Sequence, residues 1–296
     1  MTSSPNPRLG TYPLRFIHGT LTSCRPQAQT VWYGDPSMES YRNLQPASLR
    51  GLVFDIDDTV TRNGVLEPSA YAAMHQLAMA GFELVAVTGR PLGWADVLAR
   101  QWPVRVAVGE NGAGWSWVEG RRFNEGYFCS ERERGQQARL LERIRTEVAR
   151  AMPQVLVSSD DRARRCDLAF DIGELVSLPE ADIDKLVSLI EGFGVASSVS
   201  TVHAHAVPGP WNKASGVARA LADAMGIDLD AELDRWVFVG ASGNDAEAFA
   251  YFPNSVGVAN VRAHLDRLPS PPRYVTDADR GNGFAELSAH LVEGRD

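Results

Sequence analysis

Three acidic side chains follow the first buried apolar run of the sequence. Residues 52–54 (Leu-Val-Phe) are typical of a buried strand, and Asp55, Asp57 and Asp58 come directly after them. Asp55 and Asp57 are two residues apart on an extended chain, so their side chains point to one face. Converging carboxylates repel each other unless a cation or a raised pKa relieves the repulsion. A single aspartate would suffice to cap a helix, so three favour a metal site or a phosphoryl site.

Three more segments place polar residues at or just past the ends of predicted strands, where open α/β sheets bind ligands. Thr88-Gly89 offers a hydroxyl and close backbone approach to an oxyanion, although a threonine that merely ends a strand is the commoner case. Lys213 opens a predicted helix and is one of only two lysines, and the dipole there disfavours a cation, so a functional role is favoured. The turn Gly240–Asp245 either brings a carboxylate to the same edge or caps the next helix.

Short buried runs that alternate with helical periodicity predict an α/β core with right-handed crossovers. The first half of this core is predicted as strands at 52–54, 84–87 and 104–108 and helices at 68–80 and 91–100. The second half is predicted as helices at 217–225, 246–251 and 284–291 and strands at 236–239, 256–258 and 274–275. We expect both halves to build one mainly parallel sheet.

The remaining segments do not follow the strand–helix alternation of the core. Residues 114–207 give helix, strand, strand twice over, which predicts a small α+β module inserted into the core. Residues 1–48 hold six of the 17 prolines and no sustained period, which predicts a partly irregular N-terminal extension. Trp115 and Trp117 alternate with polar neighbours, and we expect them to serve packing or to form a wall for a sugar ring.

Composition narrows the function classes. The 296 residues are 44% hydrophobic, with a net charge of −8 and a pI near 5.3. No apolar run approaches the length of about 18 residues that spans a bilayer, and no secretory signal is expected. A negative chain repels phosphate backbones, so nucleic acid is a poor partner. Three distant cysteines, Cys24, Cys129 and Cys166, indicate the reduced thiols of a cytoplasmic protein.

In order and spacing, the four polar segments resemble the motifs of the haloacid dehalogenase (HAD) superfamily. The run 55–59 (Asp-Ile-Asp-Asp-Thr) looks like its D-x-D-x-T motif, and Thr88, Lys213 and the Gly240–Asp245 turn match the second, third and fourth motifs. The resemblance covers residues 49–296. It implies a Rossmann-like α/β core, 49–113 and 208–296, with an inserted α+β cap of the C2 type at 114–207, like that of sugar-phosphate phosphatases.

The resemblance also implies a mechanism. Asp55 would attack phosphorus and form an aspartyl-phosphate, and Asp57 would transfer protons. Thr88 and Lys213 would hold phosphoryl oxygens. Mg²⁺ would be bound by Asp55, the Asp57 carbonyl and Asp245. The residues expected to bind the substrate or its phosphate are Asp58, Gly89, Arg90, Asn111 and Asn244. The substrate would be a small phosphorylated metabolite, most simply a sugar phosphate. The protein would be a monomer or a homodimer.

One departure from the family pattern leaves alternatives open. Ala241 stands where the family usually has a magnesium-binding aspartate. Asp245 could substitute for it, activity could be lost, or the residue could be an engineered change. A phosphomutase on the same scaffold and a catalytically weakened binding or regulatory protein therefore stay as alternatives. A Rossmann dehydrogenase is disfavoured because no G-x-G-x-x-G loop follows the first strand.

Charged and titratable residues of the inserted segment could bind a ligand or could have only a structural role. Arg162, Arg164 and Arg165 could bind an anionic leaving group, but a solvated hairpin is favoured. His203 and His205 share one face of a predicted strand, and ordinary sheet-face histidines are favoured over ligands. A cysteine nucleophile is not expected, because no paired base is evident.

Overall fold

The structure is a computed structural model that describes residues 38–295. Residues 1–37, which hold most of the predicted N-terminal extension and Cys24, lie outside the described residues, as does Asp296. The described end of the extension is ordered on the sheet, since β1 (Glu39–Ser40) pairs in parallel with β15 (Tyr274–Val275). Cys129 and Cys166 are free thiols. No helix in the described part of the chain combines the length and apolar character needed to cross a membrane.

A nine-stranded sheet forms the core, in the order β1-β15-β14-β13-β2-β5-β6-β7-β8. Its five central strands are parallel neighbours, and almost all of their residues are buried. These strands are β14 (Asn254–Gly257), β13 (Trp236–Gly240), β2 (Gly51–Phe54), β5 (Glu83–Val87) and β6 (Val106–Gly109). Parallel strands buried on both faces read as continuous apolar runs, which is why the sequence revealed them. The predicted α/β fold with a mainly parallel sheet is confirmed.

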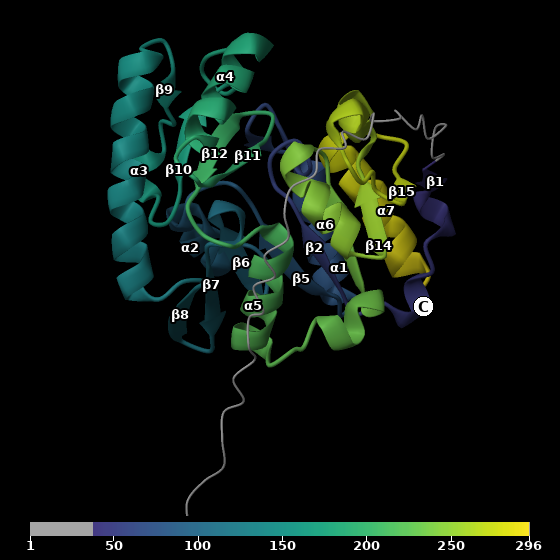
Figure 1. Cartoon of the computed structure of the whole chain (residues 1–296). Coiled ribbons are helices and arrows are strands. Elements are labelled where there is room, and N and C mark those ends of the chain that lie inside the picture. Colours follow the sequence, from purple (N-terminus) through teal and green to yellow (C-terminus); the bar gives the residue numbers. More distant parts are fainter. Residues whose placement is uncertain (1–37, 296) are drawn as a thin grey trace, which may run out of the picture. The chain divides into compact units, whose positions relative to one another are not determined.

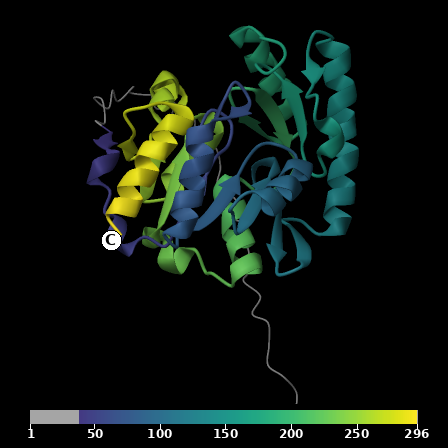
Figure 2. The ribbon, with the colours of Figure 1, turned by 180° about the vertical axis from the view of Figure 1, so that it is seen from behind.

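Helices cover both faces of this sheet, as Figures 1 and 2 show from opposite sides. One face packs on α1, α2 and α7, and the other on α5 and α6. Their bounds are α1 (Pro68–Met79), α2 (Leu92–Gln101), α5 (Lys213–Met225), α6 (Ala246–Tyr251) and α7 (Arg280–Glu293). Successive residues of β2 point to opposite faces of the sheet. Phe54 packs in the apolar cluster that includes α1, α2 and α7, and Val53 packs in the cluster that includes α5 and α6.

The inserted residues form a second, four-stranded antiparallel sheet in the order β11-β12-β10-β9. Its strands are β9 (Leu156–Val157), β10 (Leu168–Asp171), β11 (Ala196–Val199) and β12 (His203–Val207), and its helices are α3 (Glu131–Ala151) and α4 (Glu180–Glu191). We call residues 131–207 the cap segment (Figure 1). Phe170 and Ala204 pack toward the helices, so the alternate residues of these strands, including His203 and His205, lie on the other face of the cap sheet.

The start of the inserted segment differs from the prediction. Strands β7 (Gly114–Glu119) and β8 (Arg122–Tyr127) form a hairpin that pairs with β6 and extends the core sheet. Trp115 is fully buried in the core cluster that also holds Val106 and Val108. The alternation of Trp115 and Trp117 with polar neighbours is typical of a strand, but it carries no information on which sheet the strand joins.

Glu110 ties the core to the cap segment. It has a positive φ of 50° and lies fully buried at the end of β6. Its Oε1 accepts the backbone N–H groups of Leu92 and Arg165, both at 2.9 Å. Its Oε2 accepts those of Cys166 at 2.6 Å and Asp167 at 2.9 Å. One carboxylate thus satisfies four backbone donors drawn from two parts of the chain, which fixes the loop before β10 on the core.

Replacing Glu110 with glutamine should destabilise the fold. The amide nitrogen cannot accept a hydrogen bond, so two buried N–H groups lose their acceptor, and each orphaned group costs about 1–3 kcal/mol. We expect Glu110→Gln to lower the free energy of unfolding by about 2–6 kcal/mol in a denaturant titration. The matched control is Glu119→Gln, an exposed residue at the end of β7. Equal stability of the two variants would contradict the bridging role.

Candidate active site

The carboxyl edge of the central strands gathers residues that lie far apart in the sequence. Asp55 follows β2, Asp245 follows the turn after β13, and Lys213 is the first residue of α5. Lys213 Nζ donates to Asp55 Oδ1 and to Asp245 Oδ1, each at 2.7 Å. All three side chains are almost fully buried. The structure therefore brings the predicted nucleophile, lysine and fourth-motif aspartate into one cluster.

Burial dominates the titration of this cluster. Loss of solvent raises the pKa of Asp55 to about 7, against the attraction of the Lys213 ammonium, which lowers it. Burial alone would lower the pKa of Lys213, but the carboxylates of Asp245 and Asp55 raise it above its usual value. Lys213 therefore stays charged and is the cation that makes two buried carboxylates tolerable.

Asp245 is held on both of its oxygens. Oδ1 bonds to Lys213, and Oδ2 accepts the backbone N–H groups of Ala241 at 2.9 Å and Ser242 at 3.0 Å. A Cβ at Gly240 would lie 2.7 Å from this carboxylate, so glycine is required for its close approach to the strand end. The turn after β13 thus serves to orient Asp245 toward the lysine.

Asp57 is paired with Arg90. The guanidinium donates from Nε at 2.9 Å and from Nη2 at 2.8 Å, so both carboxylate oxygens are taken. Arg90 is only 2% exposed and also donates to Glu174 of the cap segment at 2.7 Å. Arg90, predicted to bind phosphate, here links the predicted proton donor to the cap segment.

The remaining predicted phosphate-binding residues lie around the Thr88 turn. Thr88 Oγ1 accepts the backbone N–H of Arg90 at 3.0 Å, and the Gly89 carbonyl accepts from Arg164 at 2.9 Å. Asn244 Nδ2 donates to Asn111 Oδ1 at 3.2 Å, which joins the loop after β13 to the loop after β6. These contacts join the loop after β5 to the cap segment, and the loop after β13 to the loop after β6.

Asp58 forms hydrogen bonds that connect its loop to two other elements. It adopts a φ of 57° and accepts from Arg280 Nε at 2.9 Å and from Thr201 Oγ1 at 2.8 Å. It therefore fastens the first loop to the start of α7 and to the turn before β12. It also lines a cavity of about 380 Å³ with Asp57 and Arg90, which leaves it at the edge of the predicted substrate site.

The donor set does not fit the predicted Mg²⁺ site. Both oxygens of Asp245 are already engaged, and the Lys213 ammonium lies between Asp55 and Asp245, where the resemblance would put a divalent ion. Ala241 contributes a buried methyl group in place of a carboxylate. Within residues 38–295, no group of three or more His, Cys, Asp or Glu side chains could hold a metal ion.

Three side chains of the cap segment are buried and have polar partners that the sequence did not indicate. Arg164 was expected on a solvated hairpin but is buried, where it bonds the Gly89 carbonyl and Asp167. His205 Nδ1 lies 2.8 Å from Asp167 Oδ2, and His203 Nε2 lies 3.0 Å from Glu174 Oε2. The period-two spacing of the histidines gave their shared face, but nothing local in the sequence indicated these partners.

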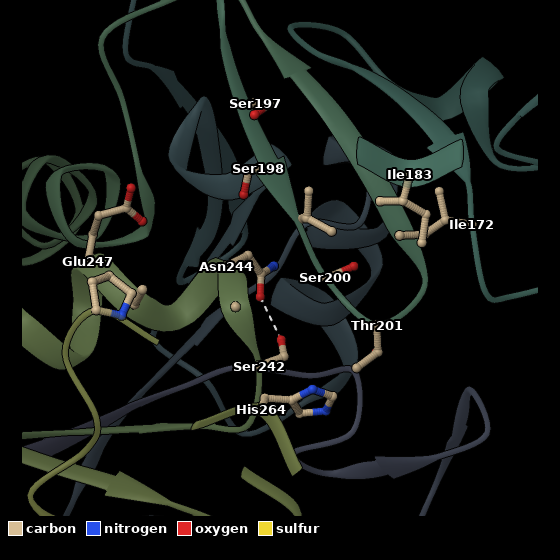
Figure 3. A pocket seen from close by; sticks show the side chains of 14 residues that line it. Ile172, Ile183, Ser197, Ser198, Ser200, Thr201, Ser242, Asn244, Glu247 and His264 are labelled. Atoms are coloured by element: carbon tan, nitrogen blue, oxygen red, sulfur yellow. Dashed lines mark hydrogen bonds between the residues drawn. The ribbon is translucent and has the colours of Figure 1, made fainter. Parts of the chain in front are cut away.

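A second cavity, of about 550 Å³, lies beside the turn after β13. Figure 3 shows Ser198 and Ser200 of the cap segment on its wall, with Ser242 and Asn244 of the core nearby and hydrogen-bonded to each other. Ile172 and Ile183 add an apolar patch. Hydroxyls mixed with apolar surface suit a ligand that carries several hydroxyl groups.

No family model matches the sequence, and no curated protein matches it. Solved structures do match the fold. The sucrose-phosphatase of Synechocystis sp., solved with sucrose and phosphate, has a TM-score of 0.59 and 19% identity over 83% of this chain and 98% of its own. The trehalose-6-phosphate phosphatase C-terminal domain of C. albicans has a TM-score of 0.60 and 13% identity over 86% and 94%.

A third solved structure names the superfamily. A phosphatase of the HAD superfamily from Bacteroides thetaiotaomicron has a TM-score of 0.55 and 16% identity over 82% of this chain and 96% of its own. The chain has the fold of HAD-superfamily phosphatases. The resemblance read from the motifs is therefore confirmed at the level of the fold, in which the predicted cluster of Asp55, Lys213 and Asp245 lies at the carboxyl edge of the sheet.

Ala241→Asp tests the metal donor set of this HAD fold directly. A third carboxylate beside Asp55 and Asp245 adds repulsion that a divalent cation relieves, so the variant should bind Mg²⁺ more tightly and be stabilised by it. The measurement is isothermal titration calorimetry with Mg²⁺, paired with thermal unfolding with and without the ion. Ala222→Asp, on the exposed side of α5, is the control. No gain in magnesium binding over the wild type would show that position 241 is not a ligand position.

Proposed function

We propose that the chain is a phosphoric monoester hydrolase that forms an aspartyl-phosphate on Asp55. The observation that carries the proposal is the buried contact of Lys213 with both Asp55 and Asp245 at the carboxyl edge of the parallel sheet. A buried carboxylate in contact with an ammonium provides a nucleophile and a partner for phosphoryl charge at one point. The fold of known HAD phosphatases supports this assignment.

In the first step, an Asp55 oxygen attacks phosphorus while the bond to the leaving oxygen breaks. Lys213 stabilises the negative charge that accumulates on the phosphoryl oxygens. Asp57 is the proton donor to the leaving oxygen; it must first be released by Arg90, which holds both of its oxygens, and take up a proton from solvent. The phosphoryl dianion offers Arg90 an alternative anionic partner, so substrate binding and release of Asp57 are coupled.

In the second step, the oxygen of a water molecule bonds to phosphorus while the bond from phosphorus to the Asp55 oxygen breaks. Asp57, now a carboxylate, takes the water proton, and Asp55 is regenerated as phosphate forms. Because Asp55 is regenerated as a carboxylate, Lys213 can again donate to Asp55 and Asp245, the contacts that the structure shows. The proposal requires no movement of the strands, only exchange of partners among side chains that already touch.

The leaving group is proposed to be a small polyhydroxylated molecule, so that the substrate is a sugar phosphate. The cavity in Figure 3 has the volume and the serine hydroxyls for such a group, and Asn244 connects it to the phosphoryl site through Asn111. Two structural neighbours are named for sugar phosphates, sucrose-phosphatase and trehalose-6-phosphate phosphatase, which supports the same class.

A catalytically weakened binding protein is the second candidate, favoured by one observation. Ala241 removes a carboxylate from the fourth motif, and Arg90 holds Asp57. A binding protein of this kind would retain affinity for sugar phosphates and release no phosphate. The phosphomutase alternative has no structural observation that favours it over hydrolysis.

Asp55→Asn should abolish phosphate release. A neutral amide is a poor nucleophile, whereas its shape preserves the contacts of the carboxylate. The measurement is phosphate release across a panel of sugar phosphates, with Asp223→Asn, exposed on α5, as the matched control. Equal activity of the wild type and Asp55→Asn would refute the nucleophile, and binding without turnover in the wild type would favour the second candidate.

Turnover should fall on the acid side of neutrality. Asp55 attacks only as the carboxylate, and burial raises its pKa to about 7. The rate constant kcat/KM should therefore rise with pH as Asp55 ionises and level off above about pH 8, one unit past that pKa. A profile that stays flat from pH 5 to 8 would show that an ionisation other than that of Asp55 governs the reaction.

A further inference from the structure

The buried guanidinium of Arg90 contacts carboxylates of both the core and the cap segment. Its Nε and Nη2 donate to Asp57 at 2.9 and 2.8 Å, and its Nη1 donates to Glu174 Oε1 at 2.7 Å. Asp160 is a more distant partner, at 3.5 Å from Nη1, and also accepts from Arg164 at 3.2 Å. Separate N–H groups thus serve Asp57 and Glu174, so the bonds to Asp57 can break while the bond to Glu174 remains.

Glu174 is held in place by the loop that follows β10. Its backbone N–H donates to Asp171 Oδ1 at 2.9 Å, and its Oε2 lies 3.0 Å from His203 Nε2. Burial lowers the pKa of His203 to about 4, so the ring is neutral near pH 7. A carboxylate can only accept, so Nε2 carries the hydrogen of this bond. The histidine therefore orients Glu174 without neutralising it, and the negative charge of Glu174 faces Arg90.

Asp57, Arg90 and Glu174 line one cavity of about 380 Å³. The arginine side chain is 2% exposed, whereas those of Asp57 and Glu174 are 14% and 22% exposed. The leaving oxygen of a substrate must come within hydrogen-bond reach of Asp57 to receive its proton. The cavity that admits this oxygen is therefore the one in which Arg90 changes partners.

The release of Asp57 has an electrostatic cost that Glu174 reduces. Removing one partner from a buried ion pair leaves an uncompensated charge, which is strongly unfavourable. When Asp57 takes up a proton, it stops compensating the charge of Arg90. Glu174, at 2.7 Å, continues to do so. A second carboxylate on a different N–H group thus makes it easier for Arg90 to give up the first.

We propose that Glu174 is a positioning residue that keeps Asp57 free to transfer protons. This inference rests on the proposed function and concerns the proton transfers of both steps. Arg90 turns Nε and Nη2 from Asp57 to the phosphoryl oxygens, while Nη1 stays on Glu174. Asp57, protonated from solvent, gives this proton to the leaving oxygen as the bond from phosphorus to that oxygen breaks. In the second step, Asp57 takes the water proton while Arg90 remains on Glu174 and the phosphoryl group.

The test compares two esters that differ in their need for a proton. The leaving group of p-nitrobenzyl phosphate is an alcohol and needs one, whereas p-nitrophenolate leaves p-nitrophenyl phosphate without one. Glu174→Gln keeps the shape of the side chain and removes its charge. We expect kcat/KM for the benzyl ester to fall at least about tenfold more than that for the phenyl ester, part of the 10²–10⁴-fold typical of general acid catalysis. The ratio of the two values is the readout, and it excludes the second step because kcat/KM covers only the steps up to the first product release.

Two further variants serve as controls. Glu174→Asp retains the charge and should keep the ratio closer to that of the wild type than Glu174→Gln does. Glu125→Gln removes a different ion pair between the core and the cap segment, that of Glu125 on β8 with Arg165, and should leave the ratio unchanged. Thermal unfolding establishes that each variant is folded.

An unchanged ratio in Glu174→Gln, whether both rate constants fall equally or neither falls, would overturn the positioning role. A wild type that releases phosphate neither from these two esters nor from the panel of sugar phosphates would instead overturn the proposed function, and the inference with it.

Discussion

The candidate active site depends on one buried ammonium. Lys213 contacts Asp55 and Asp245 at 2.7 Å, and the three side chains are removed from water at the edge of a parallel sheet. Without that charge, two carboxylates would repel each other in a medium that screens them weakly. The dipole at the start of α5 disfavours a cation, so the lysine is retained against a local cost because two strands deliver negative charge to it.

A second charged layer links the core to the cap segment. Arg90 pairs with Asp57 of the core and Glu174 of the cap segment, and Arg164 pairs with Asp167 and the Gly89 carbonyl. Each of these buried charges thus has a partner of opposite charge or a backbone acceptor across the boundary between core and cap segment. Electrostatics thus separates two proposed roles: the nucleophile, Asp55, lies beside Lys213, and the proton donor, Asp57, lies beside Arg90.

The sequence predicted the part of this arrangement that follows from strand ends. Buried runs located β2, β5 and β13, and parallel strands bring their carboxyl ends together, so the meeting of Asp55 and the Asp245 turn was foreseeable. Lys213 stood out because lysine is so rare in this chain. The sheet that the 114–127 hairpin joins was not predictable, since alternation gives a face but no partner strand.

Polar pairs between residues far apart in the chain could not be predicted from the sequence either. The four bonds to Glu110, the pairing of Arg90 with Asp57 and that of His205 with Asp167 join loops distant in the chain, and no local pattern encodes them. The Mg²⁺ site was expected from the resemblance alone, and the hydrogen bonds that engage both oxygens of Asp245 could not be foreseen from it. Motif residues fix which groups can meet, whereas the surrounding contacts decide what each group is free to do.

The most direct measurement is to locate the phosphoryl group during turnover. Enzyme mixed with a sugar phosphate is quenched in acid and reduced with borohydride, which converts an aspartyl-phosphate into homoserine, and the peptides are then sequenced by mass spectrometry. The account predicts homoserine at position 55, with the aspartates at 57, 58 and 245 unchanged. Turnover with homoserine at another position, or with none at any, would contradict it.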